Sequence, residues 1–333
     1  MELTTVWFAL IAVLWIGYFV LEGFDFGVGI LLPVLGRNEP ERRAILRTIG
    51  PVWDGNEVWV LVAGGATFAA FPEWYATLFS GFYLALFLIL VGLIVRGVGI
   101  EYRNKRGSTA WRTGWDRLIA VSSCVPALLW GVAFANIVAG VPIDADKQFT
   151  GNLLTLLNPF GLLGGLTTLL LFLTHGLVFL GLKTDGELRA RANRLVTPVG
   201  IAAAVAAVAF LAWANVQTGT PLSAAVAVVA ALAFVGALVA NRLRHEGWAF
   251  AGSAIAIALA VACLFLALFP DVMPSSTNPA YSLTTTNAAS TPYTLAIMTV
   301  VAVVFTPLVL LYQGWTYWVF RKRVATPSTP AKS

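Results

Sequence analysis

Two pairs of carboxylates stand inside segments that are otherwise apolar. Asp54 and Glu57 lie near the start of an apolar run that continues to Phe71. Glu22 and Asp25 repeat the same three-residue spacing in the run before it. Residues three apart lie near one another on the surface of an α-helix. A charge at the centre of a bilayer costs about 2.5–3.5 kcal/mol on insertion scales, so acids in a membrane helix are usually paired, hydrated or functional.

The composition indicates that these runs cross a membrane. The chain has 333 residues, of which 59% are hydrophobic and 11% are charged, whereas soluble domains have about 45–50% and about 25%. Runs of about 20 apolar residues, enough for a helix to cross the hydrocarbon core, recur along its whole length. They lack the strict alternation of membrane β-strands. We therefore predict an all-α polytopic membrane protein, because helices satisfy their own backbone hydrogen bonds in lipid.

The apolar runs predict about nine membrane helices. We expect these helices to form two helical bundles plus a peripheral helix. The expected spans cover residues 4–35, 52–71, 74–100, 118–140, 160–182, 196–216, 222–240, 248–269 and 292–320. We expect residues 1–324 to form a single transmembrane domain. The polar, Pro-containing residues 325–333 are expected to be a disordered cytoplasmic tail.

The basic residues predict the orientation. With these nine spans, all of the 21 basic residues except Lys147 fall on one side. Because Lys and Arg gather in cytoplasmic loops, this bias places the N-terminus outside and the C-terminus in the cytoplasm. The net charge of +5 is then a feature of topology, and we expect no nucleic-acid partner.

The orientation gives the depth of each acid. At the helical rise of about 1.5 Å per residue, Asp25 lies roughly 15 Å from the cytoplasmic end of its helix, and Asp54 and Glu57 roughly 5 and 9 Å from theirs. We hypothesise that these three, with Glu22 deeper, line a hydrated path from the cytoplasm, and that Arg96 balances one of them. The alternative is a static polar contact that locks the helices together, since intramembrane acids mark both ion routes and structural pairs.

Aromatic and amide side chains accompany the acids. Trp53 and Asn56 stand beside Asp54, and tryptophans commonly occupy membrane interfaces. Near the end of the last span, a group of aromatic residues is expected to belong to the same interfacial belt, namely Trp315, Tyr317 and Trp318.

The sequence offers little to hold a metal or a haem. His175 is the single histidine within a span, and a metal site normally needs a cluster of ligands. Cys124 and Cys263 lie far apart in apolar runs and are interpreted as small buried side chains. We therefore expect no metal site in this chain, and a ligand role for His175 is the less favoured of the two interpretations that the residues alone allow.

Several motifs resemble subunit II of the cytochrome bd-type quinol oxidases. The first-span sequence Glu22-Gly-Phe-Asp-Phe-Gly-Val-Gly29 is similar to the first-helix signature of that family. The stretch Pro51-Val-Trp-Asp-Gly-Asn-Glu-Val-Trp59 is similar to its second-helix signature. Further similar stretches follow in the family's order, at residues 68–72, 80–83, 96–103, 131–134, 158–163 and 270–277.

The resemblance implies a bacterial cytoplasmic-membrane subunit that is not catalytic alone. Such oxidases couple quinol oxidation to the reduction of O2 to water. Subunit I carries two b-type haems and one d-type haem, subunit II carries none, and small single-helix subunits often accompany the pair. The family's second-helix aspartate, here Asp54, is assigned to a proton route from the cytoplasm, and Asp25 matches its first-helix aspartate. Glu57 stands where some relatives have Gln.

Two other functions remain open from the residues alone. A proton-coupled secondary transporter would use the same buried acids for coupling, although no matched pair of broken helices is evident. A purely structural scaffold subunit would need the acids only for helix packing. The acids are therefore the residues on which these interpretations differ.

Overall fold

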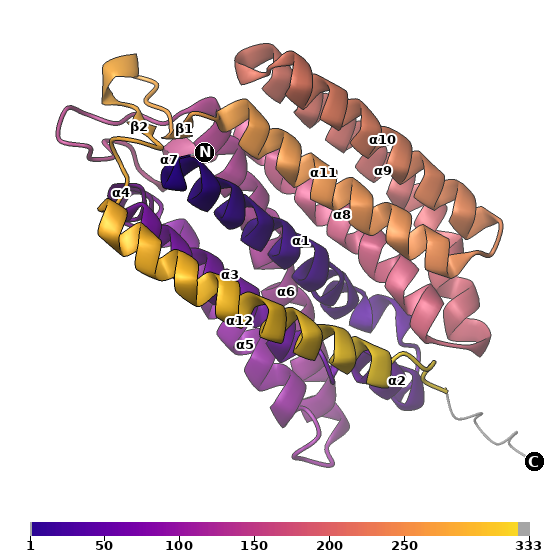
Figure 1. Ribbon diagram of the computed structural model, residues 1–333. Helices are drawn as coiled ribbons and strands as arrows, with labels where there is room; N and C mark the ends of the chain where they lie inside the picture. The colour runs from indigo at the N-terminus through magenta and orange to yellow at the C-terminus, as the bar shows by residue number, and fades with distance from the viewer. Residues whose placement is uncertain (1, 326–333) are drawn as a thin grey trace, which may run out of the picture.

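The computed structural model describes residues 2–325, and this part of the chain is almost entirely α-helical (Figure 1). Of the expected tail, all but residue 325 lies outside the described residues. Within residues 2–325, eight helices are long and apolar enough to cross a membrane. They are α1 (Leu3–Leu35), α5 (Tyr83–Tyr102), α6 (Thr109–Ala139), α8 (Pro159–Lys183), α9 (Gly186–Thr218), α10 (Pro221–Arg242), α11 (Glu246–Leu268) and α12 (Pro292–Val319).

A ninth long helix, α3 (Trp53–Ala70), packs lengthwise against α1. It is not among the eight, because Asp54, Asn56 and Glu57 in its first two turns lower the hydropathy of this short helix. With α3 included, the helices correspond in number and order to the nine expected spans. The all-α polytopic fold is thus as predicted.

The expected span over residues 74–100 is two helices in the structure. The shorter α4 (Pro72–Gly81) ends where α5 begins, and Phe82 between them has a non-helical backbone. A Cβ atom on Gly81 would lie 2.6 Å from the Phe149 side chain, which leaves no room for one. Phe82 itself is fully buried. Phe149 thus packs closely against the break, whose position helical periodicity alone does not reveal.

The basic connection after α1 folds into an amphipathic helix, α2 (Glu39–Ile49). The Asn38 side chain caps it by accepting a hydrogen bond from the Glu41 N–H at 3.0 Å, which satisfies one of the free N–H groups of the first turn. Its apolar residues, such as Ile45 and Ile49, are buried, and Arg47 faces outward. This helix closes one end of the bundle.

The opposite end carries the two outer connections. These contain α7 (Leu153–Leu156), the 3-10 helix η1 (Pro279–Tyr281), and an antiparallel pair of short strands, β1 (Asp271–Met273) and β2 (Leu283–Thr284). The Val141 N–H donates to the Pro274 carbonyl at 3.1 Å, which ties the two connections together. Figure 1 shows both beside the N-terminus.

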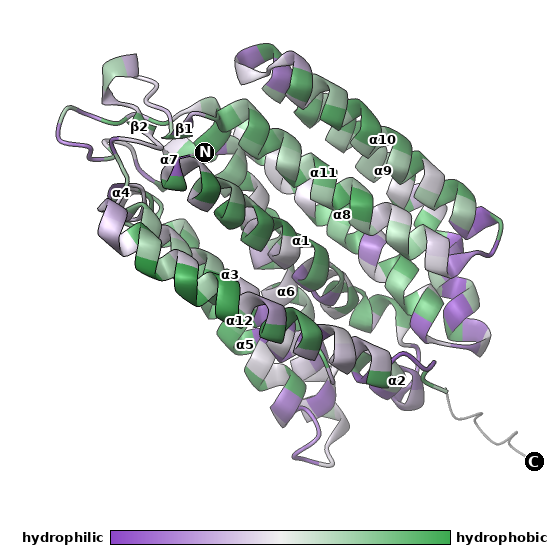
Figure 2. Ribbon diagram, viewed as in Figure 1, coloured by the Kyte–Doolittle hydropathy of each residue, from purple (hydrophilic) through white to green (hydrophobic). Residues whose placement is uncertain are grey.

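Helix α1 is the centre of the fold, since it packs against α3, α6, α8 and α11. Helix α12 is peripheral and contacts α1 and α3, and Leu295 is its one buried residue. Hydrophobic residues predominate along the long helices, and hydrophilic residues gather around α2 and around the loops after α5, α8 and α10 (Figure 2). This distribution places the first turns of α3 close to a polar end of the bundle.

Candidate functional site

The α1 acids are buried because α1 is packed on nearly all sides. Glu22 and Asp25 have no exposed surface. One turn further along, a Cβ atom on Gly27 would lie 2.1 Å from the Phe172 carbonyl oxygen and 2.9 Å from the Gly176 Cα. The backbones of α1 and α8 therefore touch at this level, as small residues allow in membrane helices.

Arg96 on α5 joins two of the acids. Its guanidinium forms an ion pair with Glu22, and its Nη2 lies 2.8 Å from Oε2 of Glu57 on α3. It also lies over the Phe26 ring, 4.8 Å from the ring centroid. Arg96 and Glu22 are fully buried, whereas the Glu57 side chain is 23% exposed. Glu57 therefore forms the rim of the site, and Glu22 lies inside it.

Asn56 on α3 connects the remaining buried acid to the last helix. Its Nδ2 donates to Oδ2 of Asp25 at 2.7 Å and to the Leu21 carbonyl at 3.3 Å. Its Oδ1 accepts hydrogen bonds from Gln313 Nε2 at 2.9 Å and from the Tyr317 hydroxyl at 2.8 Å. We call the five residues Glu22, Asp25, Asn56, Glu57 and Arg96 the acid cluster.

The acid cluster contains more carboxylates than cations. Within the described chain, three carboxylates face one guanidinium, that of Arg96. Burying an uncompensated charge is costly, and a buried carboxyl group neutralises itself by taking up a proton. One oxygen of Asp25, Oδ1, is also buried and has no hydrogen-bond partner among the residues that the structure describes. The arrangement therefore favours a site that holds at least one proton.

Asp54 does not join the acid cluster. Its side chain is exposed, and Oδ1 accepts a hydrogen bond from the N–H of the next residue, Gly55, at 2.8 Å. It stands at the start of an outward stripe of α3 that is otherwise apolar and includes Val58, Leu61 and Phe68. Beside it, the Trp53 ring packs against α5, where a Cβ atom on Gly97 would lie 3.2 Å from it.

Sequence reasoning missed two residues of the site. Tyr317 was expected in the interfacial belt, but its hydroxyl points to Asn56 instead. Gln313 was not singled out, although it is a lone amide in an apolar span. The two stand four positions apart and so share one face of α12. That spacing, together with the polarity of Gln313, is the signal that could have identified them.

His175 offers no free ring nitrogen for a ligand. Its Nδ1 lies 2.7 Å from the Ser253 hydroxyl and its Nε2 lies 3.2 Å from the Val20 carbonyl. The ring is fully buried and stacks on Phe250, with centroids 4.7 Å apart. His175 thus acts as a packed and hydrogen-bonded core residue in this structure.

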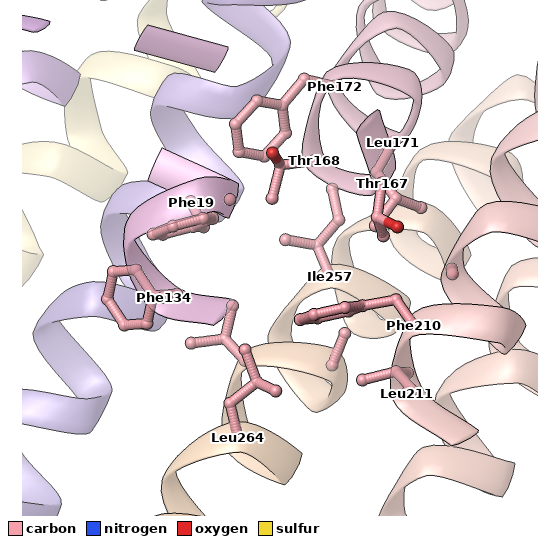
Figure 3. A pocket seen from close by; sticks show the side chains of 14 residues that line it. Phe19, Phe134, Thr167, Thr168, Leu171, Phe172, Phe210, Leu211, Ile257 and Leu264 are labelled. Carbon is pink, nitrogen blue, oxygen red and sulfur yellow. The ribbon is translucent and has the colours of Figure 1, made fainter. Parts of the chain in front are cut away.

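A cavity of about 40 Å³ lies between α1, α6, α8, α9 and α11 (Figure 3). Aromatic and aliphatic side chains line it, together with two threonines. Both hydroxyls donate to backbone carbonyls, Thr167 to Leu163 at 2.8 Å and Thr168 to Ala127 at 2.6 Å. No titratable side chain lines the cavity, so the acid cluster is the candidate site for proton chemistry.

A second polar network holds α2 beside the site. Arg103, just after α5, contacts Asp116 at 2.5 Å and Glu39 at 2.9 Å, and Arg42 contacts Asp116 at 3.0 Å. Partial burial raises the pKa of Glu39, but hydrogen bonds from Arg103 and Arg43 outweigh it and lower this pKa to about 2. Glu39 is therefore ionised at neutral pH, and its ion pairs with Arg103 and Arg112 connect α2 to the end of α5 and the start of α6.

Comparison with known proteins relates this arrangement to one family. The family described as "Cytochrome bd terminal oxidase subunit II" matches residues 3–320. The "Cytochrome bd ubiquinol oxidase subunit 2" of Bacillus subtilis (strain 168) is 42% identical over 329 residues, with 97% of each chain covered. The "Cytochrome bd-I ubiquinol oxidase subunit 2" of Escherichia coli (strain K12) is 40% identical, with 94% of this chain and 93% of the relative covered.

The fold matches a solved structure as well. A chain of the bd oxidase from Geobacillus thermodenitrificans superposes with a TM-score of 0.79 at 17% identity, covering 97% of this chain and 100% of that one. The protein is thus a multi-pass protein of the bacterial cytoplasmic membrane. On these matches, the chain belongs to the family of subunit II of the cytochrome bd terminal oxidases.

Proposed function

We propose that this chain is the haem-free subunit of a quinol:O2 oxidoreductase and that its acid cluster supplies protons from the cytoplasm. In this proposal it pairs with subunit I, which carries two b-type haems and one d-type haem, oxidises quinol and reduces O2 to water. Small single-helix subunits complete the assembly. The names of the bacterial relatives, both ubiquinol oxidase subunits, support the reaction class.

The observation that carries the proton role is the excess of buried carboxylates around Arg96. Reduction of O2 to water consumes protons, so the complex needs polar groups that accept and release them within the membrane. Glu57 at the rim and Glu22 in the interior contact the same guanidinium, and Asp25 lies beside them on α1. Intramembrane acids in such a setting are the usual elements of proton relays.

The exposed position of Asp54 supports the proposal that this chain pairs with another subunit. The cost of a carboxylate that faces hydrocarbon is greatest at mid-membrane depth, about 2.5–3.5 kcal/mol. Asp54, roughly 5 Å from the end of its span by the helical rise, meets part of that cost and is favoured by contact with protein or water. Asp54 lies on the exposed stripe of α3, and the neighbouring α12 is almost wholly exposed. We infer that subunit I covers this face and that Asp54 lies on the proton route at the contact between the two subunits.

The placement of the haems in subunit I is supported by the side chains of this chain. Both ring nitrogens of His175 are engaged. Among the described residues, no group of three or more His, Cys, Asp or Glu side chains could hold a metal ion. His175 therefore has no free ring nitrogen for a haem iron in this structure, and no step of the mechanism is assigned to a haem in this chain.

The test uses the complex purified through this chain. A reduced-minus-oxidised spectrum should contain b- and d-type haem bands, and Asp25→Asn and Asp54→Asn should each leave these bands intact while strongly lowering quinol-driven O2 consumption. Asp146→Asn, an exposed acid at the opposite end, is the matched control and should be neutral. Normal turnover of both variants would leave the acids with a structural role only, and a haem-free preparation would refute the oxidase assignment.

A further inference from the structure

We propose that Gln313 and Tyr317 of α12 are positioning residues of the proton site, which hold the Asn56 amide in the orientation that serves the ionised form of Asp25. The inference rests on the proposed function, since it concerns the same carboxyl group. It adds two residues and one helix to the site. Neither residue touches a reacting group, because both act through Asn56.

The hydrogen bonds of Asn56 have a definite polarity. On one side are the Leu21 carbonyl and Asp25 Oδ2, which accept hydrogen bonds from Nδ2. On the other side are the Gln313 amide and the Tyr317 hydroxyl, which donate to Oδ1. A carboxylate only accepts hydrogen bonds, whereas a protonated carboxyl group also donates one. The orientation shown therefore suits ionised Asp25, and a reversed amide would suit protonated Asp25.

The two α12 donors stabilise the first orientation. A reversed Asn56 would present its carbonyl to the Leu21 carbonyl, and its NH2 group would face two groups that now donate. Asn56 is fully buried, so water from bulk solvent does not compensate for lost partners, and an unsatisfied buried polar group is costly. Removing the donors makes the reversed amide more accessible and thereby favours the protonated form of Asp25.

The orientation of the Asn56 amide depends on how α12 is attached to the rest of the chain. Of its residues only Leu295 is buried, so apolar packing within this chain holds it weakly. At one end the Trp7 indole donates to the Leu295 carbonyl at 3.3 Å and to the Thr299 hydroxyl at 3.1 Å. Gln313 and Tyr317 form a polar contact near the other end, and just beyond the helix the Lys183 ammonium group donates to the Lys322 carbonyl at 3.0 Å. A displacement of α12 would therefore change the hydrogen bonding of Asp25 through the side chain of Asn56.

The experiment measures quinol-driven O2 consumption of the purified complex against pH. The variants are Tyr317→Phe, Gln313→Leu and the double substitution, and Tyr312→Phe is the matched control on the same helix, with an exposed side chain. Losing a hydrogen bond that favours the ionised form moves the titration of a carboxyl group upward, by about half a unit to one unit for one neutral hydrogen bond. Whichever form Asp25 needs in turnover, the affected limb of the pH profile should move to higher pH.

The double variant should show the largest shift, and the haem bands should be unchanged in all variants. An unshifted profile in the double variant, with Asp25→Asn severely impaired, would overturn the inference and leave the proposed function standing. Loss of haem or an equal loss of turnover at every pH in Tyr317→Phe would also overturn it, because that result marks a structural role. Normal turnover of Asp25→Asn would instead refute the proton route through Asp25.

Discussion

Replacing Arg96 with Gln tests whether the acid cluster depends on one cation. The substitution removes the guanidinium that contacts Glu22 and Glu57 and leaves a buried carboxylate without a partner. Breaking a buried ion pair by removing one side typically costs about 3–5 kcal/mol. Since about 1.4 kcal/mol is a factor of ten in an equilibrium constant, the folded population should fall more than a hundredfold relative to the unfolded one.

The loss should also depend on pH. In the variant, the acids left without Arg96 take up protons in the folded state, whereas the same groups in the unfolded chain have already released theirs at neutral pH. Stability falls with rising pH wherever the folded state binds more protons. The deficit of Arg96→Gln relative to the unsubstituted complex should therefore be larger at pH 8 than at pH 6.

The assay is the temperature at which the purified complex loses half of its haem absorbance, measured at both pH values. Arg47→Gln is the control, because Arg47 is exposed on α2. Adding Glu22→Gln to Arg96→Gln should restore much of the loss, since it removes the fully buried carboxylate that paired with Arg96 and keeps the partly exposed Glu57. If Arg96→Gln behaves like Arg47→Gln at both pH values, the acid cluster does not depend on this cation and the reasoning is wrong.

Two further predictions concern packing and the network around α2. Gly27→Val should abolish accumulation of the assembled complex, because the valine side chain would collide with the α8 backbone. Gly107→Val should accumulate normally, since nothing lies within 4 Å of a Cβ atom there. Immunoblotting of membranes measures the accumulation of both variants. Glu39 has a lowered pKa of about 2 against an ordinary value of 4.5, so its ion pair should stabilise the protein above about pH 4.5 and lose that effect as the pH falls towards 2. Thermal stability of Glu39→Gln should therefore lie below that of the unsubstituted protein at pH 7 and converge with it in acid, and a constant difference at all pH values would contradict this.

The apolar runs predicted the membrane helices well because their length is set by the bilayer and not by tertiary contacts. The acid pairs were equally visible, since any carboxylate in such a run needs an explanation. Asp54 and Glu57 show the limit of spacing arguments. Residues three apart are separated by about 60° around a helix with 3.6 residues per turn. That offset places Glu57 against Arg96 and leaves Asp54 on the outside.

The contribution of α12 was not accessible from periodicity. Gln313 and Tyr317 meet a residue more than 250 positions away, and a single sequence carries no record of which helices are neighbours. Arg96 illustrates the same limitation. Its depth in the span suggested that it balances one acid, but the structure shows it in contact with two, because a planar guanidinium presents donors in several directions.

The geometry around Arg96 also decides how a proton could cross the rim in the proposed route. Arginine does not release its proton in proteins, so Arg96 cannot be a carrier. It contacts Glu57, whose side chain is partly exposed, and Glu22, which is fully buried. Protonation of Glu57 would weaken its attraction for the guanidinium and leave that charge to Glu22, so a proton at the rim would favour the ionised state of the interior acid. Arg96 therefore couples the two carboxyl groups electrostatically. If the proton then moved inward from Glu57 to Glu22, Glu57 would be ionised again and its ion pair with Arg96 would be restored.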